Sequence, residues 1–215
     1  MLGDMAKAKA MGPGRRSATG LCATAIWPAA LLAALLGARA AHAHSQAAPR
    51  ITVSAHAGSY GMDLRLFLPA PRARVWRVLT DFTDIKRLNP AVKQAKVMRR
   101  DGQTLLQMHI KSCVLFICFP VTQTERMTLR GHRVIRGVIV PQLSSFRAGG
   151  SSWHLRTVTG GTEAHFRAAL TPSFYIPPFL GPWMIRRKLR HEMRETAAHL
   201  SAWVAARDLR KASGR

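Results

Sequence analysis

The middle of the chain alternates between apolar and polar residues. The alternation is clearest at Leu106, Met108 and Ile110, and it returns between Ala164 and Leu170. A period of two residues predicts strands of an antiparallel sheet with one apolar and one solvated face. The segments that we expect to be extended are residues 51–55, 62–68, 92–99, 104–111, 121–129, 133–140, 152–157 and 164–170.

Residues typical of turns separate these segments. Residues 58–61 (Gly-Ser-Tyr-Gly) are expected to join the first two strands. The later separators are Asp101-Gly102, Gly131-His132, Gly149-Gly150 and Gly160-Gly161. Such dipeptides indicate tight connections between neighbouring strands, so the sequence predicts a meander.

Two segments have helical periodicity instead. Pro71 suits the first turn of a helix because its missing N–H is not needed there, and apolar residues follow at helical spacing to Phe82 before Asn89-Pro90 ends the segment. A longer helix is expected at residues 182–208. Its apolar stripe consists of Ile185, Leu189, Met193, Ala197, Leu200 and Val204. A sheet with one apolar face needs a cover, and this helix supplies it, so the predicted fold class is α+β.

The first helical segment carries a longer motif. It reads Pro71-x3-Val75-Trp76-x-Val78-Leu79-Thr80-Asp81-Phe82, followed by Leu88-x-Pro90. This motif resembles the first helix of START-like (SRPBCC) proteins, the polyketide-cyclase and coenzyme-Q-binding group. The resemblance extends from Arg50 to Arg207 in element order, glycine turns and closing helix. It implies a helix-grip fold, in which a curved antiparallel sheet wraps a long C-terminal helix, and a single domain at residues 51–209.

The resemblance also implies an apolar cavity between sheet and helix, which usually holds a lipid, a quinone or another hydrophobic molecule. The side chains that we expect to line it are Met108, Ile110, Met127, Trp153, Phe166 and Met184. Flexible methionine side chains adapt to varied apolar shapes, which favours a pocket. Ordinary core packing explains the same positions and remains the alternative.

The chain begins with the pattern of a secretory signal peptide. Basic residues lead, residues 21–36 are uncharged and rich in Ala and Leu, and Ala41-His42-Ala43 places small residues around a cleavage point. A retained anchor is the alternative, but sixteen mostly small residues are short for a bilayer core of about 30 Å. We therefore predict cleavage after residue 43, a linker at 44–50, and export to the periplasm or out of the cell. Arg15-Arg16 leaves the twin-arginine route open.

The charge of the chain is strongly positive, at +23 from 33 Lys and Arg against 10 Asp and Glu. Residues 1–43 hold five of the basic residues and one acid, which leaves +19 over 172 residues, with a basic tail at 210–215. Nucleic acid is not an expected partner, because the protein is exported and has no basic tract with interleaved aromatics. An anionic membrane surface is the available acidic partner. The competing explanation is that the arginines serve solubility alone.

Two apolar segments suit contact with such a membrane. Residues 174–183 are rich in proline and large apolar side chains, and a second apolar segment lies at 114–117. Phe116 and Phe179 are the expected apolar contacts. Arg186 and Arg187 follow the first segment and supply adjacent charge.

Cys113 and Cys118 are the cysteines that remain after cleavage. If residues 114–117 form a hairpin tip, the two cysteines are directly opposed and close enough for a disulfide, which an oxidising compartment permits. If one strand runs straight through, residues five apart point to opposite faces and cannot bond. We predict the disulfide.

The sequence offers no clear catalytic or metal site. His191, Glu195 and His199 share a helix face, but ion pairs along helices produce the same pattern more often than metal sites do. Asp81 and His109 are candidate acid–base groups if they face the cavity. Two further carboxylates, expected to face solvent, are Glu125 and Glu163. We therefore expect no metal and no cofactor.

These patterns together predict an exported binding or transfer protein for a hydrophobic molecule, a lipid or a quinone. The alternative is a cyclase- or hydrolase-type enzyme that acts on a polycyclic or lipid-like substrate. A third hypothesis is an interaction module that binds a partner through its basic surface.

Overall fold

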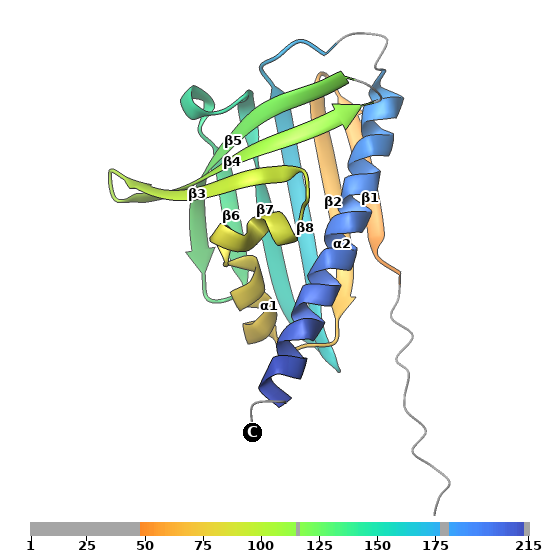
Figure 1. Ribbon diagram of the computed structural model, residues 1–215. Coiled ribbons are helices and arrows are strands. Elements are labelled where there is room, and N and C mark those ends of the chain that lie inside the picture. The colour runs from red at the N-terminus through yellow and green to blue at the C-terminus, as the bar shows by residue number, and fades with distance from the viewer. Residues whose placement is uncertain (1–47, 115–116, 177–180, 213–215) are drawn as a thin grey trace, which may run out of the picture. The chain divides into compact units, whose positions relative to one another are not determined.

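The computed structural model describes residues 48–114, 117–176 and 181–212. Its centre is one antiparallel sheet of eight strands in the order β1-β2-β8-β7-β6-β5-β4-β3. The strands are β1 (Arg50–His56), β2 (Ser59–Leu68), β3 (Val92–Arg100), β4 (Gln103–Val114), β5 (Ile117–Arg130), β6 (Val134–Ile139), β7 (Phe146–Val158) and β8 (Gly161–Pro172). The sheet is curved and not closed, and a long C-terminal helix lies along it (Figure 1). The predicted α+β helix-grip fold is confirmed.

The helices differ in detail from the prediction. The first helix, α1 (Arg72–Leu79), ends where the Thr80 hydroxyl donates a hydrogen bond to the Trp76 carbonyl at 2.8 Å, and a 3-10 helix, η1 (Phe82–Arg87), follows. A second 3-10 helix, η2 (Pro141–Leu143), precedes β7. The closing helix, α2 (Pro182–Ala212), runs past the expected end at residue 208. It enters the segment assigned to a tail because no glycine or proline interrupts residues 208–212.

The turn between β1 and β2 is shorter than predicted. His56 pairs with Ser59, so Ala57 and Gly58 alone form the turn, with φ angles of 48° and 74°. Positive φ at both central residues is the geometry of a type I′ hairpin turn. Residues 59–61, expected in the turn, belong to β2.

The pair Gly149-Gly150 also departs from the prediction, because it lies inside β7 and not in a turn. The register of β7 against β8 shifts between Phe146 and Ala148, and Gly149 has a φ of 126°. A β carbon at Gly150 would lie 2.3 Å from the carbonyl oxygen of Gly137 on β6. The two glycines therefore permit a bulged strand that approaches its neighbours closely.

The core lies between the apolar face of the sheet and the helices. Leu64 and Leu68 of β2, Val75 and Val78 of α1 and Leu200 of α2 are all fully buried. Burial of each such side chain contributes on the order of 1.5–3 kcal/mol. These contacts hold α2 against the sheet.

The predicted stripe along α2 changes character along the helix. Its later members, Met193, Ala197, Leu200 and Val204, are buried in the core. Ile185 and Leu189 are only partly buried, because the first half of α2 faces a cavity. Among the described residues, no helix is long and apolar enough to cross a membrane.

Candidate functional site

A cavity of about 280 Å³ lies between the sheet and the first half of α2. Its wall consists of side chains from β2 to β8, from α1, η1 and α2, and from the segments that follow η1 and β8. Most of these groups are apolar. A concave, largely apolar space with a few polar groups is the usual form of a site for a hydrophobic small molecule.

Five of the six predicted lining residues face this cavity. Met108 and Ile110 of β4, Met127 of β5, Trp153 of β7 and Phe166 of β8 all contribute to the wall. The sixth, Met184, does not. The face that α2 turns to the cavity carries Ile185, Leu189, Glu192, Met193 and Thr196, which recur at steps of three and four. Met184 lies one position before this series, so the helix directs it elsewhere.

Two aromatic contacts shape the wall. Trp153 and Phe166 are directly opposed on β7 and β8, with ring centroids 4.8 Å apart. Phe146 and Phe174 meet edge to face at 6.2 Å and also line the cavity. The second pair was missed because Phe146 lies six residues before the expected start of its strand at residue 152.

Glu125 is the main polar feature of the wall, and its predicted position was wrong. The side chain was expected to face solvent, yet Glu125 is 2 % exposed and lines the cavity. The Gln123 amide donates to Oε1 at 2.9 Å and the Ser151 hydroxyl to Oε2 at 2.8 Å. Burial raises the pKa of the Glu125 carboxyl above its ordinary value of 4.5, and the two hydrogen bonds offset only part of this effect.

The sequence contained the signal for this position. Glu125 lies two residues before Met127, which was placed on the inner face, and side chains two apart on a strand share a face. The sheet also makes room for it. A β carbon at Gly137 would lie 2.0 Å from Glu125 Oε2, so the missing side chain on β6 allows Glu125 to reach Ser151 on β7.

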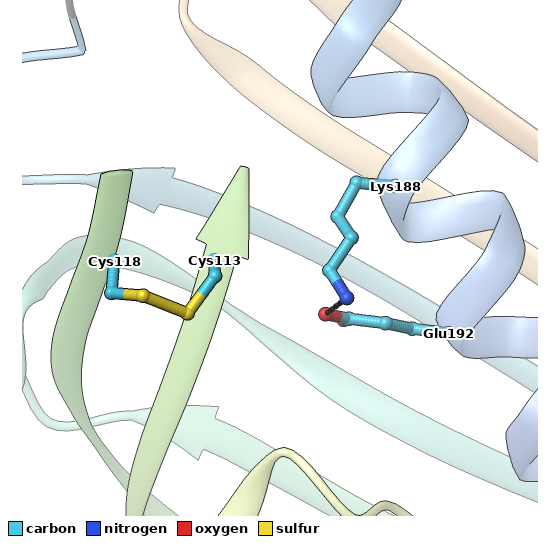
Figure 2. The surroundings of a disulfide bond; sticks show 4 residues. All are labelled: Cys113, Cys118, Lys188 and Glu192. Atoms are coloured by element: carbon cyan, nitrogen blue, oxygen red, sulfur yellow. Dashed lines mark ion pairs between the residues drawn. A yellow bond between two sulfur atoms is a disulfide. The ribbon is translucent and has the colours of Figure 1, made fainter. Parts of the chain in front are cut away.

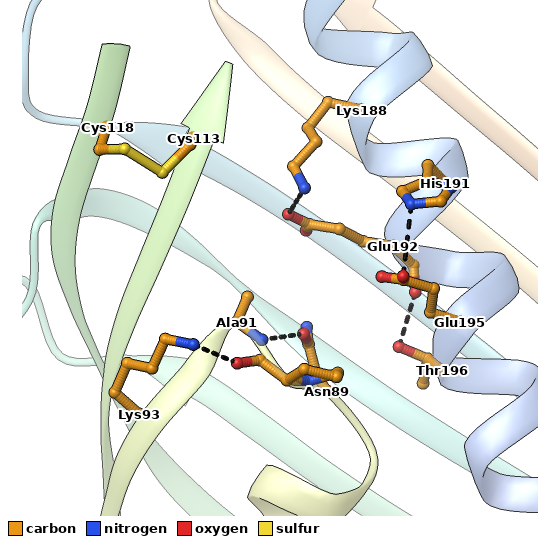
Figure 3. A network of polar contacts seen from close by, with 11 residues as sticks. Asn89, Ala91, Lys93, Cys113, Cys118, Lys188, His191, Glu192, Glu195 and Thr196 are labelled. Atoms are coloured by element: carbon orange, nitrogen blue, oxygen red, sulfur yellow. Dashed lines mark hydrogen bonds and ion pairs between the residues drawn. A yellow bond between two sulfur atoms is a disulfide. The ribbon is translucent and has the colours of Figure 1, made fainter. Parts of the chain in front are cut away.

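A second carboxylate, Glu192, enters the wall from α2. It is 8 % exposed, and its Oε1 lies 3.3 Å from Lys188 Nζ, one turn earlier on the helix (Figure 2). The Thr196 hydroxyl donates to the Glu192 carbonyl at 2.8 Å (Figure 3). Asn89 also faces the cavity, and its side chain accepts a hydrogen bond from the Ala91 amide at 2.9 Å. The polar groups of the wall thus come from both the sheet and the helix.

Cys113 and Cys118 are directly opposed on β4 and β5 and form a disulfide, with Cα atoms 3.9 Å apart (Figure 2). The expected tip of four residues is shorter, because Val114 pairs with Ile117. Phe116 lies outside the described residues.

The other residues expected at a membrane surface are only partly described. Phe179 lies outside the described part of the chain. Arg186 is half-buried and Arg187 is exposed near the start of α2, and neither forms an ion pair with a described residue. The structure therefore places the two arginines at the start of α2, and their expected neighbour Phe179 is not among the described residues.

The candidate acid–base residues lie away from the cavity wall. His109 is exposed, with Nδ1 3.2 Å from the Thr122 hydroxyl, and Asp81 accepts a hydrogen bond from Thr83 at 3.1 Å. His191 pairs with Glu195 at 3.3 Å on the surface of α2. Within the described residues, no three His, Cys, Asp or Glu side chains gather as a metal site.

A family model described as polyketide cyclase / dehydrase and lipid transport matches residues 65–204. The match covers more than half of the chain and reaches from β2 into α2, the elements that enclose the cavity. The chain belongs to the polyketide cyclase / dehydrase and lipid transport family. The family's description joins enzymes and lipid carriers, so membership is compatible with both. A search of curated protein sequences found no match.

Solved structures share the fold at low identity. A STAR-related lipid transfer protein from Xanthomonas axonopodis is 14% identical, with a TM-score of 0.54 over 74% of this chain and 99% of its own. A START superfamily protein from Mycobacterium smegmatis is 14% identical, with a TM-score of 0.53 over 68% and 97%. The ZhuI aromatase/cyclase from Streptomyces sp. R1128 is 16% identical, with a TM-score of 0.51 over 72% and 96%. At these identities the likeness establishes the fold of the family member and nothing finer.

Proposed function

We propose that the protein binds a hydrophobic small molecule, a lipid or a quinone, between the sheet and α2 and carries it in the periplasm or outside the cell. The observation that carries this proposal is the cavity of about 280 Å³ with its largely apolar wall. A simple packed core would fill this space, because protein interiors pack densely and leave few voids larger than a water molecule.

Export rests on the first 43 residues, whose basic lead, uncharged middle and small residues at Ala41-His42-Ala43 support a cleaved signal peptide. The intact mass of protein from the exported fraction should correspond to a chain that starts close to His44. A full-length species retained in the membrane would contradict export.

The ligand itself is tested by mass spectrometry of an organic extract from the purified protein. The matched variant is Met108→Trp, which fills the cavity from β4, where Met108 is 7 % exposed. The wild type should release a defined apolar compound, and Met108→Trp should release much less while it still unfolds cooperatively. Extracts that contain the same background compounds for both proteins would contradict the proposal.

A cyclase-type reaction is the second candidate. Glu125 favours it, because a buried carboxyl with a raised pKa can act as a general acid, and it faces the cavity. Glu125→Gln separates the two functions. An enzyme should accumulate substrate in this variant, so the extracted compound changes its chromatographic retention and, where ring closure also loses water, its mass. A carrier should yield the same compound from both proteins.

A further inference from the structure

The cavity wall contains a carboxyl group that no cation neutralises. Among the described residues, no Lys, Arg or His forms an ion pair with Glu125. The other titratable side chains that face the cavity from the described part of the chain are Tyr60 and Glu192, and Glu192 already pairs with Lys188. Burial in this largely apolar wall, with no cation beside the carboxyl, favours the protonated form of Glu125 over the ionised form.

A protonated Glu125 leaves one hydrogen unused beside the cavity. The contact with Ser151 spans 2.8 Å and uses one hydrogen, yet the carboxylic acid and the serine hydroxyl each carry one. The contact with Gln123 uses an amide hydrogen of Gln123. The Glu125–Ser151 pair therefore retains one O–H for a further acceptor, whichever of the two groups donates within the pair.

The surroundings of this donor are apolar. On the neighbouring strands Glu125 is directly opposite Leu106 and Ile139, and Met127 follows it along β5. The carboxyl occupies the space where a side chain at position 137 would lie, because Gly137 has none. A bound molecule thus meets hydrocarbon along most of its length and one hydrogen-bond donor at this point.

We propose that the ligand is an apolar molecule with a hydrogen-bond-accepting oxygen, such as the carbonyl of a ketone or quinone, and that the Glu125–Ser151 pair donates to that oxygen. This inference rests on the proposed function, to which it adds the polar group that the ligand carries and the residues that recognise it. A buried donor without an acceptor is costly, so the pair discriminates against a pure hydrocarbon of the same shape.

Three probes of matched shape test the inference. Naphthalene with a branched three-atom substituent is available as 2-acetylnaphthalene, 2-isopropylnaphthalene and 1-(2-naphthyl)ethylamine, which carry an acceptor oxygen, a methyl group and a cation at the same position. Their dissociation constants for the purified protein are measured by equilibrium dialysis at neutral pH. The quantity compared is the ratio of ketone affinity to hydrocarbon affinity, because it cancels the shared apolar contribution.

Two variants test whether Glu125 is responsible for the ratio of ketone affinity to hydrocarbon affinity. Glu125→Leu removes the donor, and Glu125→Gln replaces it with an amide that also donates. We expect the ratio to fall about five- to tenfold in Glu125→Leu, the factor of one hydrogen bond, and to stay within about twofold in Glu125→Gln. The comparison with the amine uses the wild type and Glu125→Gln, so poor folding of Glu125→Leu does not remove the test.

Each result has one meaning. An equal ratio in the wild type and Glu125→Leu, with both neutral probes bound, overturns the inference and leaves the proposed function standing. Tightest binding of the amine to the wild type, lost in Glu125→Gln, also overturns it, because the Glu125 carboxyl would then be an ionised acceptor. No binding of any probe overturns the proposed function together with the inference.

Discussion

Glu125 is the more deeply buried of the two carboxyl groups that face the cavity among the described residues. It is buried, it accepts hydrogen bonds from Gln123 and Ser151, and it faces the space enclosed by the sheet and α2. Burial disfavours its charged form, so its carboxyl binds a proton more tightly in the folded protein than in the unfolded chain. Folding stability is therefore linked to pH through this residue.

The sign of that linkage gives the first prediction. A carboxyl whose folded pKa is raised stabilises the protein at low pH, and this stability is lost as pH rises from the ordinary value of 4.5 through the folded pKa. Denaturant unfolding at a series of pH values should show the wild type losing about 1.4 kcal/mol per pH unit relative to Glu125→Gln within that window. A constant difference between the two proteins across the window would contradict a raised pKa.

The sequence contained a signal for the inward position of Glu125 that the prediction did not use. The alternation that correctly placed Met108, Ile110 and Met127 also places Glu125 inward, but its charge led to the opposite assignment. Charged residues are rarely buried, so the residue type was given more weight than the position of Glu125 in the alternation. The contact with Ser151 could not be predicted, because it crosses β6 at Gly137 and depends on the register of three strands.

The hairpin of β4 and β5 is the element on which the cysteine prediction rests. Cys113 and Cys118 face each other in a ladder that runs from Thr104–Met127 to Val114–Ile117. Titration of the native, unreduced protein should detect no thiol from this pair, and only Cys22 should react if residues 1–43 are retained. Two reactive thiols in protein without residues 1–43 would contradict the disulfide.

The energy of the disulfide should be modest. Cys113→Ser with Cys118→Ser should lower the free energy of unfolding by about 2 kcal/mol, because the bond closes only a short loop. Reduction of the wild type is the matched comparison and should give a similar loss. The ladder of hydrogen bonds keeps the hairpin formed in both cases.

Element boundaries were the weakest part of the sequence prediction. Period-two alternation located all eight strands, and period-3.6 spacing located α2. Two element boundaries differ from the prediction. Gly149-Gly150 is typical of a turn but lies within the bulged strand β7. The first helix, α1, ends at Leu79 with Thr80 as its cap, before the expected end at Phe82. Both depend on contacts with neighbouring elements, which the local sequence does not specify.

The fold of the whole molecule could be predicted from three features of the sequence. A meander with one apolar face and a closing amphipathic helix permit little other than the observed arrangement, and the motif around Val75 and Trp76 narrowed it further. The dimensions of the cavity did not follow, because Phe146, Phe174 and η1 reach it from segments that were expected to be irregular or helical.

The positive charge of the molecule gives a prediction about membranes. The protein should sediment with anionic vesicles, bind neutral vesicles weakly, and be released by salt, since ions screen surface charges beyond about 8 Å at physiological ionic strength. Arg186→Glu with Arg187→Glu should weaken sedimentation several-fold. The control, Arg126→Glu with Arg136→Glu, makes the same change of net charge at exposed positions on β5 and β6.

The control variant shows whether the protein binds anionic vesicles through a local surface at the start of α2 or through its total positive charge. A smaller effect of the sheet variant would support a membrane surface at the start of α2. Equal effects of both variants would indicate that total charge alone attracts the protein. Equal, salt-independent binding to both vesicle types would remove the electrostatic contribution altogether.

The central claim is that the space between sheet and α2 is a binding cavity. Its most direct test is a fluorescence titration of the wild type and Met108→Trp with the neutral apolar dye N-phenyl-1-naphthylamine, with thermal unfolding of both proteins recorded alongside. We predict one saturable site per wild-type chain, and at least tenfold weaker binding in Met108→Trp with cooperative unfolding retained. No saturable binding to the wild type, or equal binding to both folded proteins, would contradict the claim.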